Sequence, residues 1–143
     1  MKILVIQENG RHEANRHFRE CFSVQRACVR LGHECDVWGL GHESFLAPID
    51  FDSYDLLINA ENYSWDWLPD FADIRRPLKL NWAIDAHVRG VKPYRRLMRQ
   101  GRFDLTLQAT KDFVDAQSIW FPNCYDDELI HPLPDVKKQH RLG

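Results

Sequence analysis

The stretch Lys2-Ile3-Leu4-Val5-Ile6-Gln7 decides the fold class, because a short and nearly continuous apolar run is typical of a buried central strand in a parallel sheet. The loop Glu8-Asn9-Gly10-Arg11 ends it, and apolar residues then recur with helical spacing from about His12 to Leu31. Gly32 stands where a helix would end in a left-handed turn, and His33–Trp38 follows as a second strand. This order of elements predicts a β-α-β unit.

The remainder of the chain continues the alternation of strands and helices. Short helices are expected from Pro93 to Gly101 and from Lys111 to Ala116. Four more apolar runs predict strands at Tyr54–Ala60, Leu78–Ile84, Asp104–Ala109 and Ser118–Pro122. We therefore expect an open α/β fold with a mostly parallel, Rossmann-like sheet sandwiched by helices. Residues 1–125 would form this domain, and residues 126–143 a linker or tail.

Composition limits the class of protein. The chain has 143 residues, 44% of them hydrophobic and 28% charged, with a net charge of -2. This balance is typical of one globular domain, and it is too mild for a surface that binds nucleic acid throughout. No apolar run approaches the roughly 20 residues that span a bilayer, and the N-terminus becomes acidic at Glu8, too early for a signal peptide. We therefore expect a cytoplasmic protein without a transmembrane segment.

The four cysteines favour a structural interpretation. Cys21, Cys28, Cys35 and Cys124 form no C-x-x-C pair, which argues against zinc ribbons and thioredoxin-like sites. Cys21 and Cys28 are seven apart on one side of the expected helix, as small buried apolar residues would be. Disulfides are not expected in a reducing cytoplasm.

Polar residues gather where the predicted strands end. Glu8, Gly10 and His12 follow the first strand, and Asn62 follows the third. Ligands of open parallel sheets bind beyond the carboxyl ends of the strands, so these residues predict a binding cleft. Gly10 would let backbone approach a ligand, and the loop with the following helix start would hold an anion or a hydroxyl. Loops are polar for other reasons too, so each residue alone has a structural interpretation.

Asp85 and His87 follow the fourth strand. They are two apart on this strand, so we expect their side chains to point the same way. A carboxylate that orients an imidazole and raises its basicity suits a general base for a hydroxyl. The alternative is an Asp85 that caps the following turn, with His87 on the surface.

Familiar nucleotide and metal motifs are absent from the sequence. The first loop has one glycine, so it matches neither G-x-G-x-x-G nor the P-loop. His12 and His17 are five apart, and the zinc helix H-E-x-x-H requires four, so no metal site is expected. A response-regulator interpretation is not favoured, because Glu8 is a lone acid and Asp55 begins its strand rather than ending it.

A run of six bases without an intervening acid lies in the second half of the chain. A solvated basic helix is one interpretation of it. The other is a surface for phosphate, an acidic acceptor, a peripheral membrane contact or a second domain. The six residues are Arg89, Lys92, Arg95, Arg96, Arg99 and Arg102.

Three segments in order carry a resemblance to a known family. They are Trp82-Ala83-Ile84-Asp85-Ala86-His87, Gln108-Ala109-Thr110-Lys111-Asp112, and the longer Trp120-Phe121-Pro122-Asn123-Cys124-Tyr125-Asp126-Asp127-Glu128-Leu129-Ile130-His131-Pro132. With the sheet pattern, they resemble the N-terminal half of bacterial GT-B-fold glycosyltransferases of the spore-maturation (CgeB-like) type. The resemblance covers nearly the whole chain, but half of a family member.

The resemblance implies a role as the acceptor-side domain of a nucleotide-sugar-dependent glycosyltransferase. His87 and Asp85 would be catalytic, and Gly10, His12 and Asn62 would bind the sugar acceptor. This domain would bind no cofactor or metal, because the nucleotide-sugar donor would be held by a C-terminal domain that follows about Gly143. The isolated chain is then expected to be inactive. The alternatives are a stand-alone, non-enzymatic α/β ligand-binding module and a flavodoxin-like flavin or phosphorelay protein.

Overall fold

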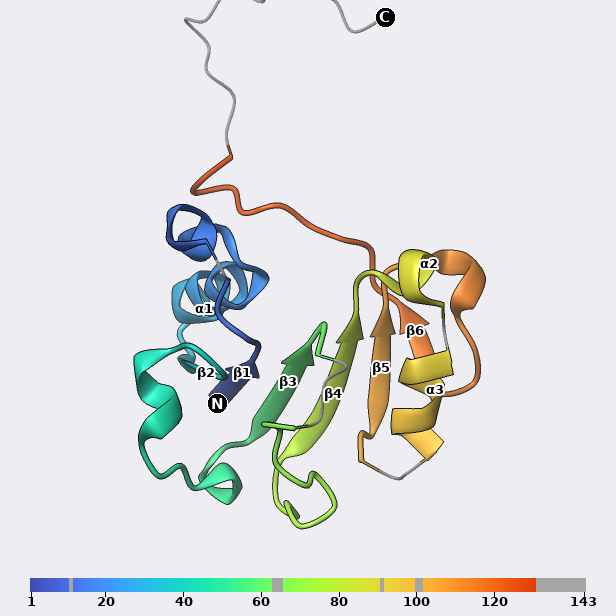
Figure 1. Ribbon diagram of the computed structural model, residues 1–143, viewed down its shortest axis with the longest axis horizontal. Coiled ribbons are helices and arrows are strands. Elements are labelled where there is room, and N and C mark those ends of the chain that lie inside the picture. Colours follow the sequence, from blue (N-terminus) through green and yellow to red (C-terminus); the bar gives the residue numbers. More distant parts are fainter. Residues whose placement is uncertain (11, 63–65, 91, 100–101, 131–143) are drawn as a thin grey trace, which may run out of the picture.

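The protein is an open, six-stranded, all-parallel α/β sheet, seen in a computed structural model that describes residues 1–10, 12–62, 66–90, 92–99 and 102–130 (Figure 1). The strand order is β2-β1-β3-β4-β5-β6. The expected fold class is therefore confirmed. The strands are β1 (Lys2–Ile6), β2 (Glu34–Trp38), β3 (Leu56–Ala60), β4 (Leu78–Ala83), β5 (Leu105–Gln108) and β6 (Ser118–Trp120).

One helix covers one face of the sheet. Helix α1 (Glu20–Arg30) connects β1 to β2, and its Cys21 packs in one cluster with Val5 of β1 and Cys35 of β2. Strand register assigns the alternate residues Ile58, Trp82 and Leu107 of β3, β4 and β5 to this same face, which we call the α1 face. Cys21 and Cys35 are buried and Cys28 is half-buried, all as free thiols, which matches their expected packing role.

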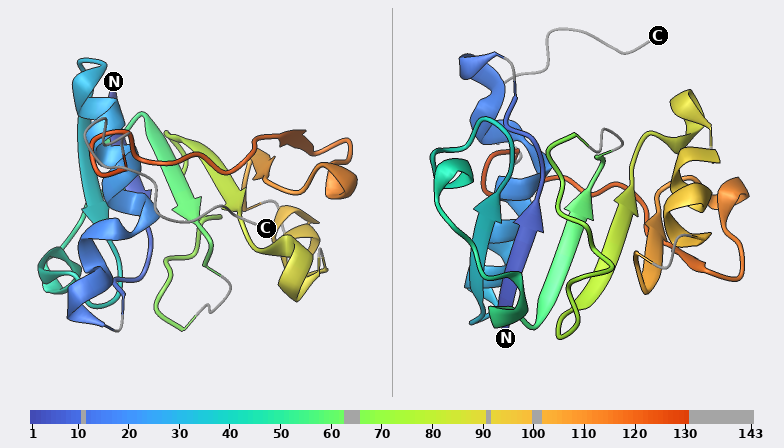
Figure 2. Two further views of the ribbon diagram at one scale, coloured as in Figure 1. Left: turned by 90° about the horizontal axis from the view of Figure 1, so that it is seen from above. Right: turned by 60° about the horizontal axis from the view of Figure 1, so that its bottom comes forward.

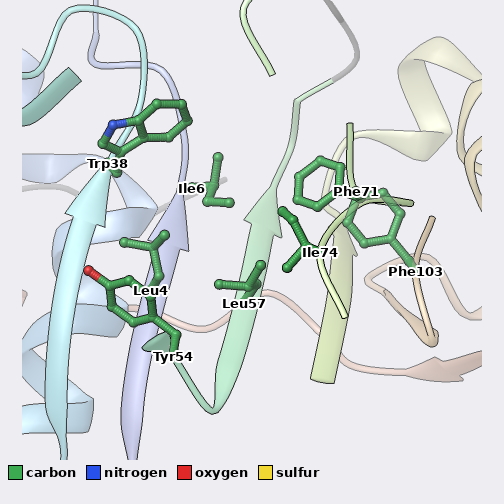
Figure 3. Close-up of a cluster of buried hydrophobic side chains, with 8 residues drawn as sticks. All are labelled: Leu4, Ile6, Trp38, Tyr54, Leu57, Phe71, Ile74 and Phe103. Atoms are coloured by element: carbon green, nitrogen blue, oxygen red, sulfur yellow. The ribbon is translucent and has the colours of Figure 1, made fainter. Parts of the chain in front are cut away.

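The opposite face holds the larger aromatic core. Leu4, Ile6 and Leu57 point to it from the strands, and Phe71 and Ile74 cover them from the β3–β4 connection (Figure 3). The short helices η2 (Glu43–Leu46), η3 (Phe51–Ser53), α3 (Lys92–Arg99) and η4 (Lys111–Phe113) belong to the connections that pass over this opposite face.

The first helical segment is not continuous as the periodicity predicted. A 3₁₀ helix, η1 (Glu13–Phe18), comes first, and the extended Arg19 (φ -63°, ψ 147°) separates it from α1. Phe18 is 54% exposed, so the predicted apolar stripe is interrupted at its start. The connection before α1 therefore stands away from the sheet, and the helix itself is only 11 residues long.

The segment Phe121–Ile130, which we call the strap, returns from β6 to α1 on the α1 face (Figure 2). Arg26 of α1 hydrogen-bonds the Asp126 carboxylate, and Arg30 pairs with Asp127 and Glu128, each at 3.0 Å. Asp126, Asp127 and Glu128 of the predicted linker thus contact the domain, and residues 131–143 lie outside the described part. Among the described helices, none is long and apolar enough to cross a bilayer.

Candidate functional site

The carboxyl ends of β1 and β3 are the topological switch point of the sheet. The connection after β1 passes over the α1 face to β2, whereas the connection after β3 passes over the opposite face to β4. Open parallel sheets bind ligands where neighbouring connections diverge in this way. We call residues 7–10, 12, 61–62 and 85–87 the switch-point edge. It contains every site residue that the sequence predicted.

Asn62 joins the two diverging strands with its side chain. Its Nδ2 donates to the Ile6 carbonyl at 2.8 Å and to the Asn59 carboxamide at 2.7 Å, and its Oδ1 accepts from the Glu8 amide at 3.4 Å. Asn62 is 4% exposed, so both its amide hydrogens are used inside the protein. The residue predicted to bind an acceptor is placed to position Glu8 instead, with one Oδ1 lone pair left for another partner.

Glu61 fixes the next strand end, and the sequence analysis did not single it out. Its Oε2 accepts hydrogen bonds from the Ile84 and Asp85 amides, the latter at 3.0 Å, and its Oε1 accepts one from the Tyr94 hydroxyl at 2.7 Å. Glu61 has φ 53°, a left-handed conformation that is unfavourable for a residue with a side chain. Three hydrogen bonds of the Glu61 side chain hold this conformation. They fix Glu61, the residue after β3, against the start of α2 (Ala86–Arg89).

Gln7 occupies the N-terminus of α1 from the end of β1. Its Oε1 accepts from the Cys21 amide at 3.0 Å, and its Nε2 donates to the Glu20 carboxylate at 2.8 Å. The N-cap residue Arg19 makes no side-chain cap, and its carbonyl accepts the Phe22 amide at 3.1 Å. A buried glutamine on a different element thus supplies the cap that satisfies the helix start. The sequence signal for this cap was that the apolar run of β1 ends in a polar residue, Gln7.

Gly39 brings the loop after β2 against the same strand end. A Cβ atom at this residue would lie 2.1 Å from the Gln7 carbonyl oxygen, and its φ is 153°. Only glycine permits this approach. His42 of the same loop contacts the Gln7 carbonyl through Nε2 at 3.0 Å, and burial lowers the pKa of His42. The β1 end is therefore packed from both sides.

Gly10 and His12 lie beside the start of η1. The Gly10 carbonyl accepts from Arg16 Nε at 3.0 Å, and its amide donates to Asn9. The φ of Gly10 is not positive, and its predicted role, a close approach of backbone to a ligand, stays a prediction. His12 is exposed, and its carbonyl accepts the Asn15 amide, which leaves the imidazole at the surface.

The structure corrects the strand geometry expected for Asp85 and His87. Strand β4 ends at Ala83, Asp85 is the N-cap of α2, and His87 lies within that helix. Neighbours two apart in a helix do not share a face, so the argument for a common orientation was wrong. Asp85 forms no side-chain cap, which also removes the expected structural alternative for it. His87 is exposed and Asp85 is half-buried, so both remain accessible from the edge.

The basic run lies apart from the switch point. Arg95 pairs with Asp115 at 3.1 Å, and Arg102 pairs with Asp70 at 3.2 Å. The side chains of Arg89 and Arg99 lie outside the described part. Across the described ranges, no three His, Cys, Asp or Glu side chains gather closely enough to hold a metal ion.

Searches against protein-family models, curated proteins and solved structures found no match for this chain. Its function is therefore argued from the site itself.

Proposed function

We propose that this chain is the acceptor-side domain of a glycosyltransferase that uses a nucleotide-sugar donor. Its switch-point edge would bind a hydroxyl-bearing acceptor, and a second domain would bind the donor. The resemblance of the three segments that contain Asp85, Lys111 and Asp126 to GT-B enzymes supports the reaction class.

The occupied N-terminus of α1 is the observation that carries the proposal. Parallel sheets that bind nucleotides direct free amides at the start of the first helix toward a phosphate. Here the Cys21 amide is bound to Gln7 and the Phe22 amide to Arg19. Among the described residues of the edge, the exposed side chains are those of Glu8, His12 and His87, which suit a polyhydroxyl ligand better than a diphosphate.

The proposed chemistry requires one proton transfer from this domain. The acceptor hydroxyl oxygen forms a bond to the anomeric carbon, and the bond from that carbon to the nucleotide diphosphate breaks. His87 would take the hydroxyl proton as general base, because its imidazole is exposed at the switch-point edge. Asp85, the N-cap of the same helix, would contribute its negative charge near the site, although the two side chains do not share a helix face.

Binding by the 143-residue chain tests the proposal. Amide resonances of an isotope-labelled sample should shift at Glu8, Gly10 and Asp85 when mono- and oligosaccharide fragments are added. Uridine diphosphate and flavin mononucleotide should cause no shift at these amides. Tight binding of either nucleotide there would overturn the proposal and favour a flavodoxin-like protein instead.

Activity gives a second test of the assigned base. In a protein that transfers sugar, His87→Ala should lower turnover by roughly 10²–10⁴-fold, the usual contribution of a general base. Its melting temperature should change little, because His87 is exposed. Unchanged turnover would show that His87 is a surface residue without a role.

A stand-alone ligand-binding module is the second candidate, and the strap favours it. Asp126 and Glu128 lie in the predicted linker, yet both bind α1 rather than leaving the domain. Saturable saccharide binding with no effect of any nucleotide-sugar, and no transfer by any form of the protein, would favour this candidate.

A further inference from the structure

A pocket of about 420 Å³ lies between α1, the sheet and the strap, away from the switch-point edge. Ile58, Trp82 and Leu107 form its floor, on the α1 face of three neighbouring strands. Val24 and Ala27 line it from α1. This volume lies in the range of about 300–1,000 Å³ that small-molecule sites in proteins occupy.

Strand order explains why the pocket exists. Connections between parallel strands are almost always right-handed, so successive steps in one direction across a sheet pass over one face. The connections from β3 to β6 all move in one direction across the sheet and lie on the opposite face. Helix α1 is the one described helix on the α1 face. Only the strap crosses the α1 face of β3, β4 and β5 among the described residues.

The charges around the pocket are already paired with one another. Arg26 binds Asp126, and Arg30 binds Asp127 and Glu128. An ionic ligand would have to break these pairs and lose its own hydration, which is costly in an apolar setting. The lining therefore selects against a charged ligand.

One polar atom of the floor has no partner. The indole N–H of Trp82 is buried and makes no hydrogen bond within the described structure, and the side chain is 4% exposed. A buried donor without an acceptor is unfavourable, and buried tryptophans usually find one. The ring of Phe121, in the strap, stands edge-on to the Trp82 ring at 5.6 Å between centroids. Phe121 is 39% exposed, so its ring contacts the indole but is not buried in the core.

The strap argues against a helix as the occupant of the pocket. It is attached to α1 through Arg26 and Asp126 and crosses the strands, so a rod about 10 Å wide could not lie along the sheet without releasing it.

We propose that this pocket binds an uncharged apolar molecule that carries one hydrogen-bond acceptor, such as a carbonyl or ether oxygen. The apolar body fills the space above Ile58 and Leu107. Phe121 swings aside, and the acceptor oxygen receives the Trp82 indole N–H.

Indole resonances of the 143-residue chain test this assignment, with acetophenone, ethylbenzene and benzoate as probes. Acetophenone should bind saturably and move the Trp82 indole proton downfield, because that proton acquires an acceptor. Ethylbenzene should bind with a smaller shift, and benzoate should not bind. Trp38 is the internal control: its indole N–H is also buried and without a partner, but it lies on the opposite face. Equal shifts of both indoles, or binding of benzoate, would overturn the proposal.

Two pairs of variants separate the pocket from general effects. Ala27→Phe should fill the space and weaken acetophenone binding at least about tenfold, whereas Val29→Phe, exposed on the same helix, should not. Trp82→Phe keeps an apolar ring without the N–H, so ligand-observed spectra should show acetophenone weakened roughly 3–10-fold and ethylbenzene unchanged. Equal losses for both ligands would show that the indole donates nothing to the ligand.

Discussion

The two faces of the sheet are covered in different ways. On the opposite face, Phe71 is 0% exposed, and its ring lies 4.7 Å from that of Phe103. On the α1 face, Leu78 is 52% exposed, and Leu80 and Leu105 are half-buried. The opposite face includes the buried polar side chains of Asn59, Asn81, Thr106 and Gln108, so a more apolar composition does not explain why that face is better buried.

Topology explains it. The β3–β4 connection and α3 cover the opposite face because each step toward β6 passes over that side. The α1 face receives one helix and the strap, whose Tyr125 and Ile130 are 71% and 58% exposed. Among the described residues, this sheet is therefore covered more completely on the opposite face than on the α1 face.

Removing core side chains from each face tests the contrast with the largest effect. Phe71→Ala should lower the free energy of unfolding by about 3–5 kcal/mol, the usual result of emptying an aromatic core site. Leu80→Ala removes a half-buried side chain and should cost at most about 2 kcal/mol. Urea unfolding measures both. Equal losses would show that the α1 face is as well packed as the other.

A Gln7 variant tests how α1 is held on the α1 face. Gln7 hydrogen-bonds the start of α1, whereas side chains of the strap, such as Tyr125 and Ile130, are exposed. Gln7→Met keeps the shape but removes the acceptor of the Cys21 amide and the donor to Glu20. The loss should be about 1–3 kcal/mol, because a buried amide is left without a partner. Gln25→Met is the matched control. It breaks one half-buried bond to Cys35 and should cost less than about 1 kcal/mol in the same urea titration. A neutral Gln7→Met would mean that water caps the helix.

The sequence was sufficient for the sheet because strand signals are local. The run Lys2–Gln7 and the runs in β3 and β5 are apolar or alternate with period two, and the structure places each within one or two residues. The helix start was missed because Arg19 adopts an extended conformation for a tertiary reason, the Gln7 cap. No periodicity of the helix itself encodes that contact.

The candidate site was predictable by region and not by geometry. Residues that follow strands collect at one edge, so chain order alone predicted that Gly10, Asn62 and Asp85 lie at strand ends, and their roles in a site stay predictions. Their hydrogen bonds depend on side chains from other strands: Glu61 and Asn62 act through β4 and β1. The switch of Asp85 and His87 from strand to helix follows from where β4 stops, a boundary that apolar pattern leaves uncertain by a few residues.

Thr106 offers a smaller test, on the opposite face. Its hydroxyl is buried and has no partner within the described structure, although the side chain is 3% exposed. Thr106→Val keeps the β-branched shape and removes this group, so stability should rise by about 0.5–1 kcal/mol. Thr110→Val, where the side chain caps nothing, should change it little. Thermal unfolding measures the stability of both variants. A lower melting temperature for Thr106→Val would indicate that a water is bound at the hydroxyl.

The strap should loosen at low pH, and this is the smallest expected effect. Hydrogen bonding from Arg26 lowers the pKa of Asp126 below its ordinary value of 3.8. A carboxyl whose pKa is lowered by folding stabilises the fold above its unfolded pKa, and this contribution is lost as the pH falls through the folded value. Strap contacts should therefore be intact at neutral pH and weaken below about 3.8.

Amide resonances followed from pH 7 to 2.5 read this transition. Those of Asp126–Ile130 should move before those of β3, since acid first releases the strap and leaves the sheet folded. Asp52, Asp55 and Asp115 also have lowered pKa values, so the comparison must be made between the parent and Asp126→Asn. The variant should show a loosened strap already at pH 7 and no separate acid step for residues 126–130. A strap that titrates identically in both proteins would show that Arg30, through Asp127 and Glu128, holds it without Asp126.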